Sequence, residues 1–282
     1  MVNTFLDSEN LSYEKAKYIF LPIPYEKTTS FLKGTANAPE EIIKNSYSLE
    51  LFDPETGKIY SDEDFYTLKS VDFNAADNEK ISLGKIEERV KEEYRESKHL
   101  ISIGGEHTIT LPIVRAIKEI KGDFSIIFFD AHYDMRDSYE GSKFSHACVM
   151  RRIYEEGFDI TGIGMRAGSI EDFEFSQKRE IETFALTNFD KRKFEERLNK
   201  IGEKIYISVD FDFFDPSILP TVGTPEIEGG TLKEYKQVLR IIEKGGKNIV
   251  GMDFTEFLPV RNLPQYSYIA SSIIFKTLNI LF

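Results

Sequence analysis

The sequence predicts an α/β fold built on a parallel sheet with helices on both faces. Apolar runs of strand length alternate along the 282 residues with segments of helical periodicity, as in strand–helix–strand units. The runs are continuously apolar, which is typical of parallel strands buried on both faces. We find no repeat, low-complexity tract or linker-like segment, so we expect residues 1–282 to form a single domain.

The expected strands are short apolar runs bounded by turn residues or charges. They lie at residues 18–24, 100–103, 124–130, 160–165, 181–186, 204–210 and 248–254. The sequence Asp53–Gly57 is typical of a turn, and we expect it to join two further short strands or extended pieces.

The expected helices follow two signals, a proline that suits a first turn and apolar residues that recur along one face. Pro39 and Pro112 would each begin a helix, and Glu40 and Glu41 are favourable at the positive end of the first one. The other helices are expected at residues 85–98, 149–156, 189–200, 232–243 and 266–282.

Composition excludes several classes of protein. A net charge of −12 argues against a surface for nucleic acid or anionic membranes. The single cysteine, Cys148, allows neither an intrachain disulfide nor a multi-thiolate zinc site. The start, Met1–Lys15, has no apolar core typical of a signal peptide, and no apolar run reaches the roughly 18 residues of a membrane span. We therefore expect a cytoplasmic protein.

Acidic residues and histidines follow four of the expected strands. Asp130, His132 and Asp134 come at the end of one strand, and alternate residues of an extended chain point the same way. The other three strands are followed by Glu106 and His107, by Asp210 and Asp212, and by Glu256. Sites in open parallel sheets form outside the carboxyl ends of the strands, so these groups are expected to converge.

Four aspartates and two histidines offer oxygen and imidazole donors, which suit Mn²⁺ or a similar octahedral ion better than a structural zinc. Six ligands suit two ions that share bridging carboxylates, so we expect a metal-assisted hydrolase. Each residue alone has another explanation: His107 could be a hydrogen-bonded turn residue, and Glu256 could pair with Arg261. Those explanations require independent coincidences at four strand ends.

Three segments resemble the signature motifs of the ureohydrolase family, which comprises arginases, agmatinases and their relatives. They are Gly104–Thr108, Asp130–Asp134 and Ser208–Pro216, and segments 220–225, 229–230 and 251–256 continue the similarity. It extends from about Ile19 to the expected C-terminal helix. The resemblance implies a three-layer α/β/α fold around a mostly parallel eight-stranded sheet, two Mn²⁺ ions per subunit, and hydrolysis of a guanidino group to urea and an amine.

The resemblance also implies a role for each residue. One ion would be held by His107, Asp130, Asp134 and Asp210, and the other by Asp130, His132, Asp210 and Asp212. Asp134 would orient the attacking hydroxide, His146 would carry a proton to the leaving amine, and Glu256 would bind the guanidinium. A homo-oligomer, either a trimer or a hexamer, is expected.

Segments 23–30 and 135–146 resemble agmatinases and lack the Ser-Gly-Asn run of arginases. Agmatine, cleaved to putrescine and urea, is therefore the leading substrate, and putrescine biosynthesis the expected pathway. Arginine, guanidinobutyrate, aminopropyl-agmatine and formiminoglutamate remain open, as does a non-catalytic metal-binding relative. A two-metal phosphohydrolase would need basic residues at the strand ends to hold phosphate, and only Arg136 and Arg166 are near.

Glu106 is one departure from the family pattern. The family often has an aspartate before its first histidine ligand, so the glutamate implies a shift in the geometry of the groups around the metal ligands.

Overall fold

The computed structural model describes residues 4–7 and 12–282 of the chain. Residues 1–3 and 8–11, part of the start that is expected to lack a signal peptide, lie outside the described residues. The described residues form one eight-stranded sheet in the order β2-β1-β3-β8-β7-β4-β5-β6, and every neighbouring pair is parallel. The predicted α/β fold is confirmed, with a sheet that is parallel throughout.

The strands are β1 (Tyr18–Ile23), β2 (Phe65–Thr67), β3 (His99–Gly104), β4 (Ser125–Phe129), β5 (Asp159–Ile163), β6 (Thr183–Phe184), β7 (Lys204–Asp210) and β8 (Asn248–Thr255). The helices are α1 (Ala38–Asn45), α2 (Glu79–Glu93), α3 (Thr110–Lys121), α4 (Val149–Glu155), α5 (Ile170–Lys178), α6 (Lys191–Lys200), α7 (Leu232–Lys244) and α8 (Pro264–Leu281). No helix among the described residues is both long and apolar enough to cross a membrane.

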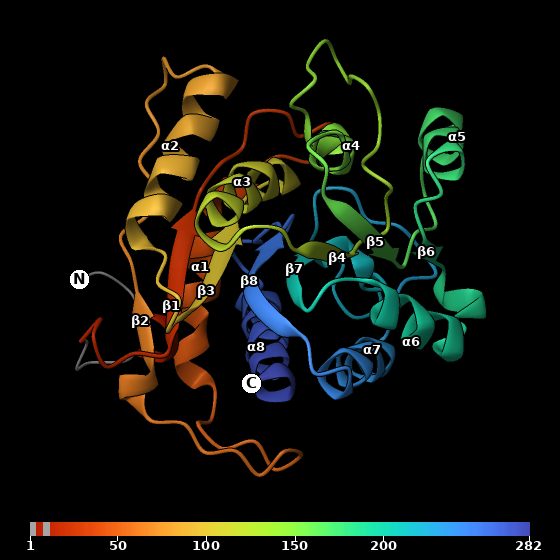
Figure 1. Cartoon of the computed structure of the whole chain (residues 1–282). Coiled ribbons are helices and arrows are strands. Elements are labelled where there is room, and N and C mark those ends of the chain that lie inside the picture. Colours follow the sequence, from red (N-terminus) through yellow and green to blue (C-terminus); the bar gives the residue numbers. More distant parts are fainter. Residues whose placement is uncertain (1–3, 8–11) are drawn as a thin grey trace.

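Helices cover both faces of the sheet, which gives the three layers seen in Figure 1. Alternate residues of β4 belong to different cores: Ile127 and Phe129 lie in the core that includes residues of α1, α6, α7 and α8, whereas Ile126 and Phe128 lie in the core that includes residues of α2, α3 and α4. This is the two-sided burial expected of a continuously apolar parallel strand.

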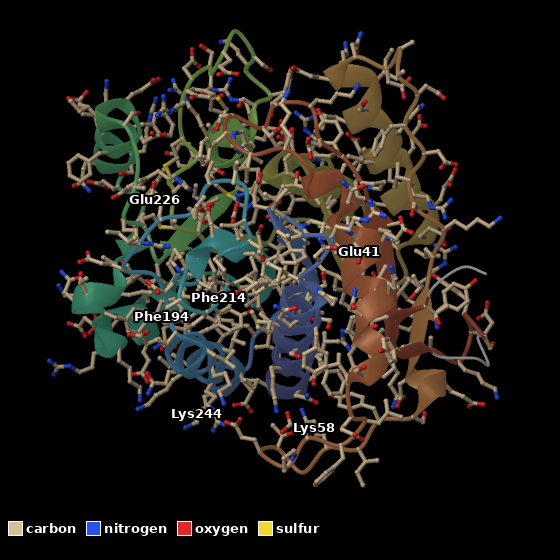
Figure 2. All side chains as sticks on the ribbon, turned by 180° about the vertical axis from the view of Figure 1, so that it is seen from behind. Glu41, Lys58, Phe194, Phe214, Glu226 and Lys244 are labelled. Atoms are coloured by element: carbon tan, nitrogen blue, oxygen red, sulfur yellow. The ribbon has the colours of Figure 1, made fainter. Side chains whose placement is uncertain are left out.

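The face under α6 and α7 is rich in aromatic rings. Phe194 and Phe214, both labelled in Figure 2, are fully buried there, and the ring of Phe214 lies 5.1 Å from that of Tyr235. Edge-on contacts of this kind add to the free energy gained by burying the rings. The charged side chains labelled in the same view, such as Lys58 and Lys244, lie at the surface.

Three elements differ from the prediction. Helix α2 spans Glu79–Glu93 where residues 85–98 were expected, because the Asn78 side chain accepts a hydrogen bond from the Ile81 amide and caps the helix earlier. Strand β2 and helix α5 have no counterpart in the prediction. The turn at residues 53–57 does join two extended pieces, since Phe52 and Ile59 form an antiparallel bridge around it.

Candidate metal and active site

The four groups of polar residues lie at one edge of the sheet. They follow β3, β8, β7 and β4, which are consecutive neighbours in the sheet, so the carboxyl ends of these strands lie side by side. His107 lies in the short turn of helix that follows β3, and Asp210 is the last residue of β7. The structure therefore brings together residues that are up to 149 positions apart in the sequence.

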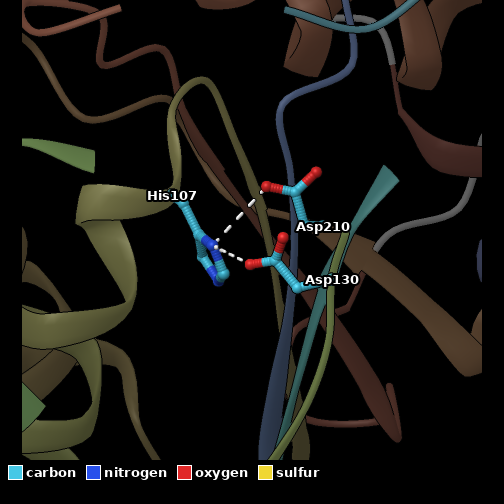
Figure 3. A group of neighbouring side chains, drawn as sticks. All are labelled: His107, Asp130 and Asp210. Carbon is cyan, nitrogen blue, oxygen red and sulfur yellow. Dashed lines mark ion pairs between the residues drawn. The ribbon is translucent and has the colours of Figure 1, made fainter. Parts of the chain in front are cut away.

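His107 is the centre of the first cluster. Its Nδ1 atom lies 3.1 Å from Asp130 Oδ2, 3.0 Å from Asp134 Oδ2 and 3.5 Å from Asp210 Oδ2. Figure 3 shows Asp130 and Asp210 directed at this ring from neighbouring strand ends. One ligand atom from each of His107, Asp130 and Asp210 lies within 4.8 Å of the others, which is close enough to hold one ion.

Asp130, His132 and Asp212 make up a second cluster of the same dimensions. The Nδ1 atom of His132 lies 2.9 Å from Asp212 Oδ2 and 3.7 Å from Asp130 Oδ1. Asp130 is common to both clusters and offers a different oxygen to each histidine, which is the arrangement that a carboxylate bridging two ions would need.

The electrostatics of the clusters fit divalent cations. The Oδ2 atom of Asp130 is buried and has no hydrogen-bond partner among the described residues. Burial, followed by the charges of Asp134 and Asp212, raises the pKa of Asp130 to about 8. Burial and the charges of Asp212 and Asp130 raise the pKa of Asp210 well above its ordinary range. Carboxylates that are this costly to ionise together become favourable ligands once positive charge is added.

For the histidines, burial and the neighbouring carboxylates shift the pKa in opposite directions. Burial alone would lower the pKa of His132, but the charge and hydrogen bond of Asp212 outweigh it and raise that pKa to about 10. Burial would also lower the pKa of His107, yet Asp130 and Asp134 raise it well above its ordinary value. In the described chain, histidines are the only ion-pair partners of the four aspartates, so no lysine or arginine takes the place of a cation.

Asp134 and Glu256 have unusual backbone conformations. Their φ angles are 52° and 63°, in the left-handed region that non-glycine residues rarely adopt. The alternation that would align Asp130, His132 and Asp134 holds only while the chain stays extended, and the backbone turns at Asp134, where its carbonyl accepts hydrogen bonds from Met150 and Arg151 at the start of α4. Strained conformations of this kind persist where the surrounding structure fixes them, commonly at functional sites.

A chain of buried hydrogen bonds contacts His107 at Nε2, the ring nitrogen that does not face the aspartates. Its Nε2 atom lies 2.9 Å from Ser208 Oγ, and the Ser208 hydroxyl donates to Asp253 at 2.6 Å. Tyr206 also donates to Asp253, at 2.7 Å. Because Ser208 donates to the carboxylate, it accepts from Nε2–H, which leaves Nδ1 free to act as a ligand. Nothing in the sequence marks Tyr206 and Asp253 as partners, since both lie inside apolar strands.

His146 and Glu256 lie next to the clusters. The Nδ1 atom of His146 is 3.4 Å from Glu256 Oε1, and its Nε2 atom is 3.2 Å from Ser30 Oγ. Burial would lower the pKa of His146, but the hydrogen bond and charge of Glu256 raise it to about 9. Glu256 Oε1 also accepts from the His107 amide, whereas its Oε2 atom is buried without a partner beside Gly223.

A cavity of about 130 Å³ gives access to these groups. His132, Asp134, His146, Asp210 and Asp212 line it, together with Ser30, Tyr133, Arg136, Tyr139 and Thr224. The guanidinium of Arg136 lies 4.7 Å from the Tyr139 ring, and its Nε atom lies 3.6 Å from Asp172 Oδ2. Ser30 lies in the agmatinase-like segment 23–30, but its contact with His146 depends on tertiary structure that the sequence does not show.

Three comparisons with known proteins agree with one another. The sequence model of the arginase family matches residues 16–279. An N(1)-aminopropylagmatine ureohydrolase of Thermus thermophilus is 36% identical over 251 residues, covering 88% of this chain and 84% of that one. The agmatinase of Pyrococcus horikoshii is 30% identical over 280 residues, covering 96% and 94%. The crystal structure of an agmatine ureohydrolase from Thermoplasma volcanium superimposes with a TM-score of 0.84 at 29% identity, covering 100% and 94%.

Proposed function

The chain belongs to the arginase family and is a ureohydrolase that acts on guanidino compounds; we propose that its substrate is agmatine, which it cleaves to putrescine and urea. The observation that supports this most strongly is the pair of possible metal-binding clusters that share Asp130, beside a cavity lined by Asp210, Asp212 and His146, the last of which contacts Glu256. The shared carboxylate favours two ions over one.

We propose Mn²⁺ as both ions, because the donors are carboxylates and imidazoles and include no thiolate. His107, Asp130, Asp134 and Asp210 would hold one ion, and Asp130, His132, Asp210 and Asp212 the other. When bound, a pair of such ions lowers the pKa of water towards neutrality and stabilises developing negative charge.

Glu256 binds the guanidinium in this proposal. Its Oε2 atom is buried without a partner among the described residues, so a cationic N–H donor there would satisfy it. His146 donates the proton that the leaving amine needs, and the raised pKa of its imidazole, about 9, keeps that proton available at neutral pH. Asp134 lines the same cavity as His146, with its Oδ2 atom 3.0 Å from His107 Nδ1, and orients the nucleophile in this proposal.

The charges around the cavity favour a substrate whose other end is an ammonium. Arg136 lies beside Asp172 and the Tyr139 ring, so its charge is already balanced and is a poor partner for a substrate carboxylate. Glu226, labelled in Figure 2, is an exposed carboxylate whose Oε1 atom lies 3.7 Å from His132 Nε2. A carboxylate at this position favours agmatine over arginine or guanidinobutyrate.

N1-aminopropylagmatine is a second candidate substrate. The name of the Thermus thermophilus relative favours it, and it keeps the guanidinobutyl amine while adding a further amine. The cytoplasmic location, the single domain and the trimer or hexamer remain predictions.

Urea release from Mn²⁺-loaded protein tests the proposal, with agmatine, N1-aminopropylagmatine, arginine and guanidinobutyrate in parallel. We expect kcat/KM for agmatine to exceed that for arginine by about 100-fold or more. A higher value for N1-aminopropylagmatine would keep the chemistry and change the substrate. Release of urea from none of them, with two ions bound per chain, would contradict the proposed function and favour a non-catalytic protein.

A further inference from the structure

The buried carboxylate of Glu106 organises a loop that covers part of the site. Glu106 has no solvent exposure, and its two oxygens accept four hydrogen bonds. Oε2 accepts from the backbone amides of Lys27 at 2.9 Å and Thr28 at 2.7 Å, and Oε1 accepts from the hydroxyls of Thr28 at 2.8 Å and Thr108 at 3.0 Å. A carboxylate with this many donors fixes the loop rigidly.

Thr28 connects this carboxylate to His146. Its hydroxyl donates to Glu106 and accepts from the backbone amide of His146 at 3.0 Å, across 118 positions of sequence. His146 begins a helical turn (His146–Cys148) whose N-cap residue, Ser145, makes no capping hydrogen bond, and the Ser145 hydroxyl is buried without a partner among the described residues. From a distant loop, Thr28 thus accepts from one of the backbone amides that have no partner within the turn at its start.

The same loop also reaches the imidazole itself. Ser30, two residues after Thr28, places its hydroxyl 3.2 Å from His146 Nε2. On the other edge of the ring, Nδ1 faces Glu256, whose amide donates to the Gly105 carbonyl at 2.7 Å. Gly105 packs so tightly on Tyr25 that a Cβ there would lie 2.0 Å from the Tyr25 carbonyl oxygen. Thr28 therefore contacts the backbone of His146, and Ser30 and Glu256 contact the two edges of its ring. Thr28 and Ser30 belong to the loop that Glu106 binds, and the Glu256 amide donates to Gly105.

We propose that Glu106, acting through Thr28, is a positioning residue that holds the His146 imidazole in place for proton transfer. This role rests on the proposed function of His146 as the proton donor. Neither Glu106 nor Thr28 touches the substrate in this proposal. The Glu106 side chain is longer than that of aspartate by one methylene, about 1.5 Å of reach, which brings its carboxylate to the Thr28 hydroxyl.

Thr28→Val tests the link to His146, because it removes the hydroxyl and keeps the side-chain volume. We expect kcat for urea release from agmatine to fall about 10-fold with little change in KM, since the proton donor is displaced while substrate binding is retained. Thr28→Ser restores the hydroxyl and should restore kcat. Thr29→Val is the matched control, because the Thr29 side chain makes no hydrogen bond in the described part of the chain.

A double-mutant cycle separates this role from a merely structural one. In a His146→Ala background, Thr28→Val should cause no further loss of kcat, because the group it positions is gone. A full 10-fold loss in that background would show that Thr28 does not act through His146 and would overturn the proposal. If His146→Ala alone leaves kcat unchanged, the proton-donor role in the proposed function fails, and the positioning role fails with it.

Glu106→Gln tests the contact between Glu106 and Thr28. The amide replaces one acceptor oxygen by a donor, so it cannot accept from both backbone amides and both hydroxyls at once. We expect a fall in kcat of about 10-fold that does not add to that of Thr28→Val. Bound Mn²⁺ is measured in every variant, and additive losses at full metal content would contradict a shared pathway through Thr28.

Discussion

Buried carboxylates of two kinds surround this site. The cluster carboxylates, Asp130, Asp210 and Asp212, face one another and two histidines. The scaffold carboxylates, Glu106, Asp172 and Asp253, are buried just as deeply but accept hydrogen bonds from neutral donors of the protein. Asp172 accepts from the amides of Met135 and Ser169 and from the Ser169 hydroxyl, and Asp253 accepts from Tyr206 and Ser208.

The two sets of carboxylates differ in what balances the cost of burying them. Burial raises the pKa of Asp253 and of Glu106, but hydrogen bonds from Tyr206, Ser208 and Thr28 work against the shift. Asp130 has no such neutral donor at Oδ2, and neighbouring carboxylates raise its pKa further, to about 8. The cluster carboxylates also accept hydrogen bonds from backbone amides, but the buried Oδ2 atom of Asp130 has no donor among the described residues, and an added cation would satisfy it.

Asp130→Asn should have the largest effect, because it neutralises the ligand common to both clusters. We expect loss of both bound metal ions and of urea release, measured by elemental analysis and by a urea assay. Asp123→Asn, at a side chain that is 93% exposed, is the control and should keep both ions. Two Mn²⁺ per chain in Asp130→Asn would show that the cluster does not depend on a bridging carboxylate.

His146→Ala comes next, because it removes the proposed proton donor but no ligand. We expect kcat to fall by about 10²–10⁴-fold with both ions retained. The control is His99→Asn at the amino end of β3, where the ring packs on Phe282 at 3.9 Å. Unchanged turnover in His146→Ala would remove this residue from the mechanism and leave the clusters untouched.

The stability of the metal-free protein should fall as pH rises. The folded state holds a proton on Asp130, whose pKa is about 8, whereas an exposed aspartate in the unfolded chain releases it near pH 3.9. The unfolded state therefore binds fewer protons between these values, and the free energy of unfolding decreases with pH. Metal binding strengthens over the same range because the ligands must be deprotonated.

Thermal unfolding with Mn²⁺ and with a chelator measures both effects. We expect the difference in Tm between the two samples to grow from about pH 6 to about pH 8. A difference that stays constant or shrinks would mean that Asp130 and Asp210 are already ionised without metal.

Tyr206→Phe should have the smallest effect of the four, because it removes one donor from a scaffold carboxylate. Asp253 Oδ2 loses its 2.7 Å hydrogen bond, and we expect the free energy of unfolding to fall by about 2 kcal/mol. Metal content should be unchanged, since Ser208 still connects Asp253 to His107. Tyr47→Phe, at a ring that is 65% exposed, is the matched control for thermal unfolding. Loss of a metal ion in Tyr206→Phe would show that metal binding depends on a scaffold carboxylate as well, which would contradict the distinction between cluster and scaffold carboxylates.

The sequence predicts those parts of the fold whose signal is local. Strands β1, β4 and β7 are mostly apolar, and the acidic residues at and after the ends of β4 and β7 mark the edge where the site forms. Strand β2 has only three residues, too few for any periodicity. Helix α5 escapes prediction because its buried residues are the polar Asp172 and Ser176, while Ile170 and Phe173 are exposed, which reverses the usual pattern.

The candidate site also has parts that local sequence predicts and parts that depend on tertiary structure. Spacing alone brings Asp130 and His132 together, because both follow one strand within three residues. The turn at Asp134 could not be predicted, since a positive φ at an aspartate depends on what the surrounding structure fixes. The contacts of Thr28 and Ser30 with His146 span more than 110 positions, and no local pattern marks them.

The position of β8 in the sheet has a consequence for how the protein is made. This last strand lies between β3 and β7, and within the described residues it alone joins β2-β1-β3 to β7-β4-β5-β6. His107 belongs to the first group, and Asp130 and Asp210 to the second. During synthesis, N-terminal segments leave the ribosome first, so both groups emerge before the strand that unites them. The cluster that includes His107 therefore forms only when residues 248–255 have paired, whereas Asp130, His132 and Asp212 of the other cluster all follow β4 and β7, which pair directly with each other.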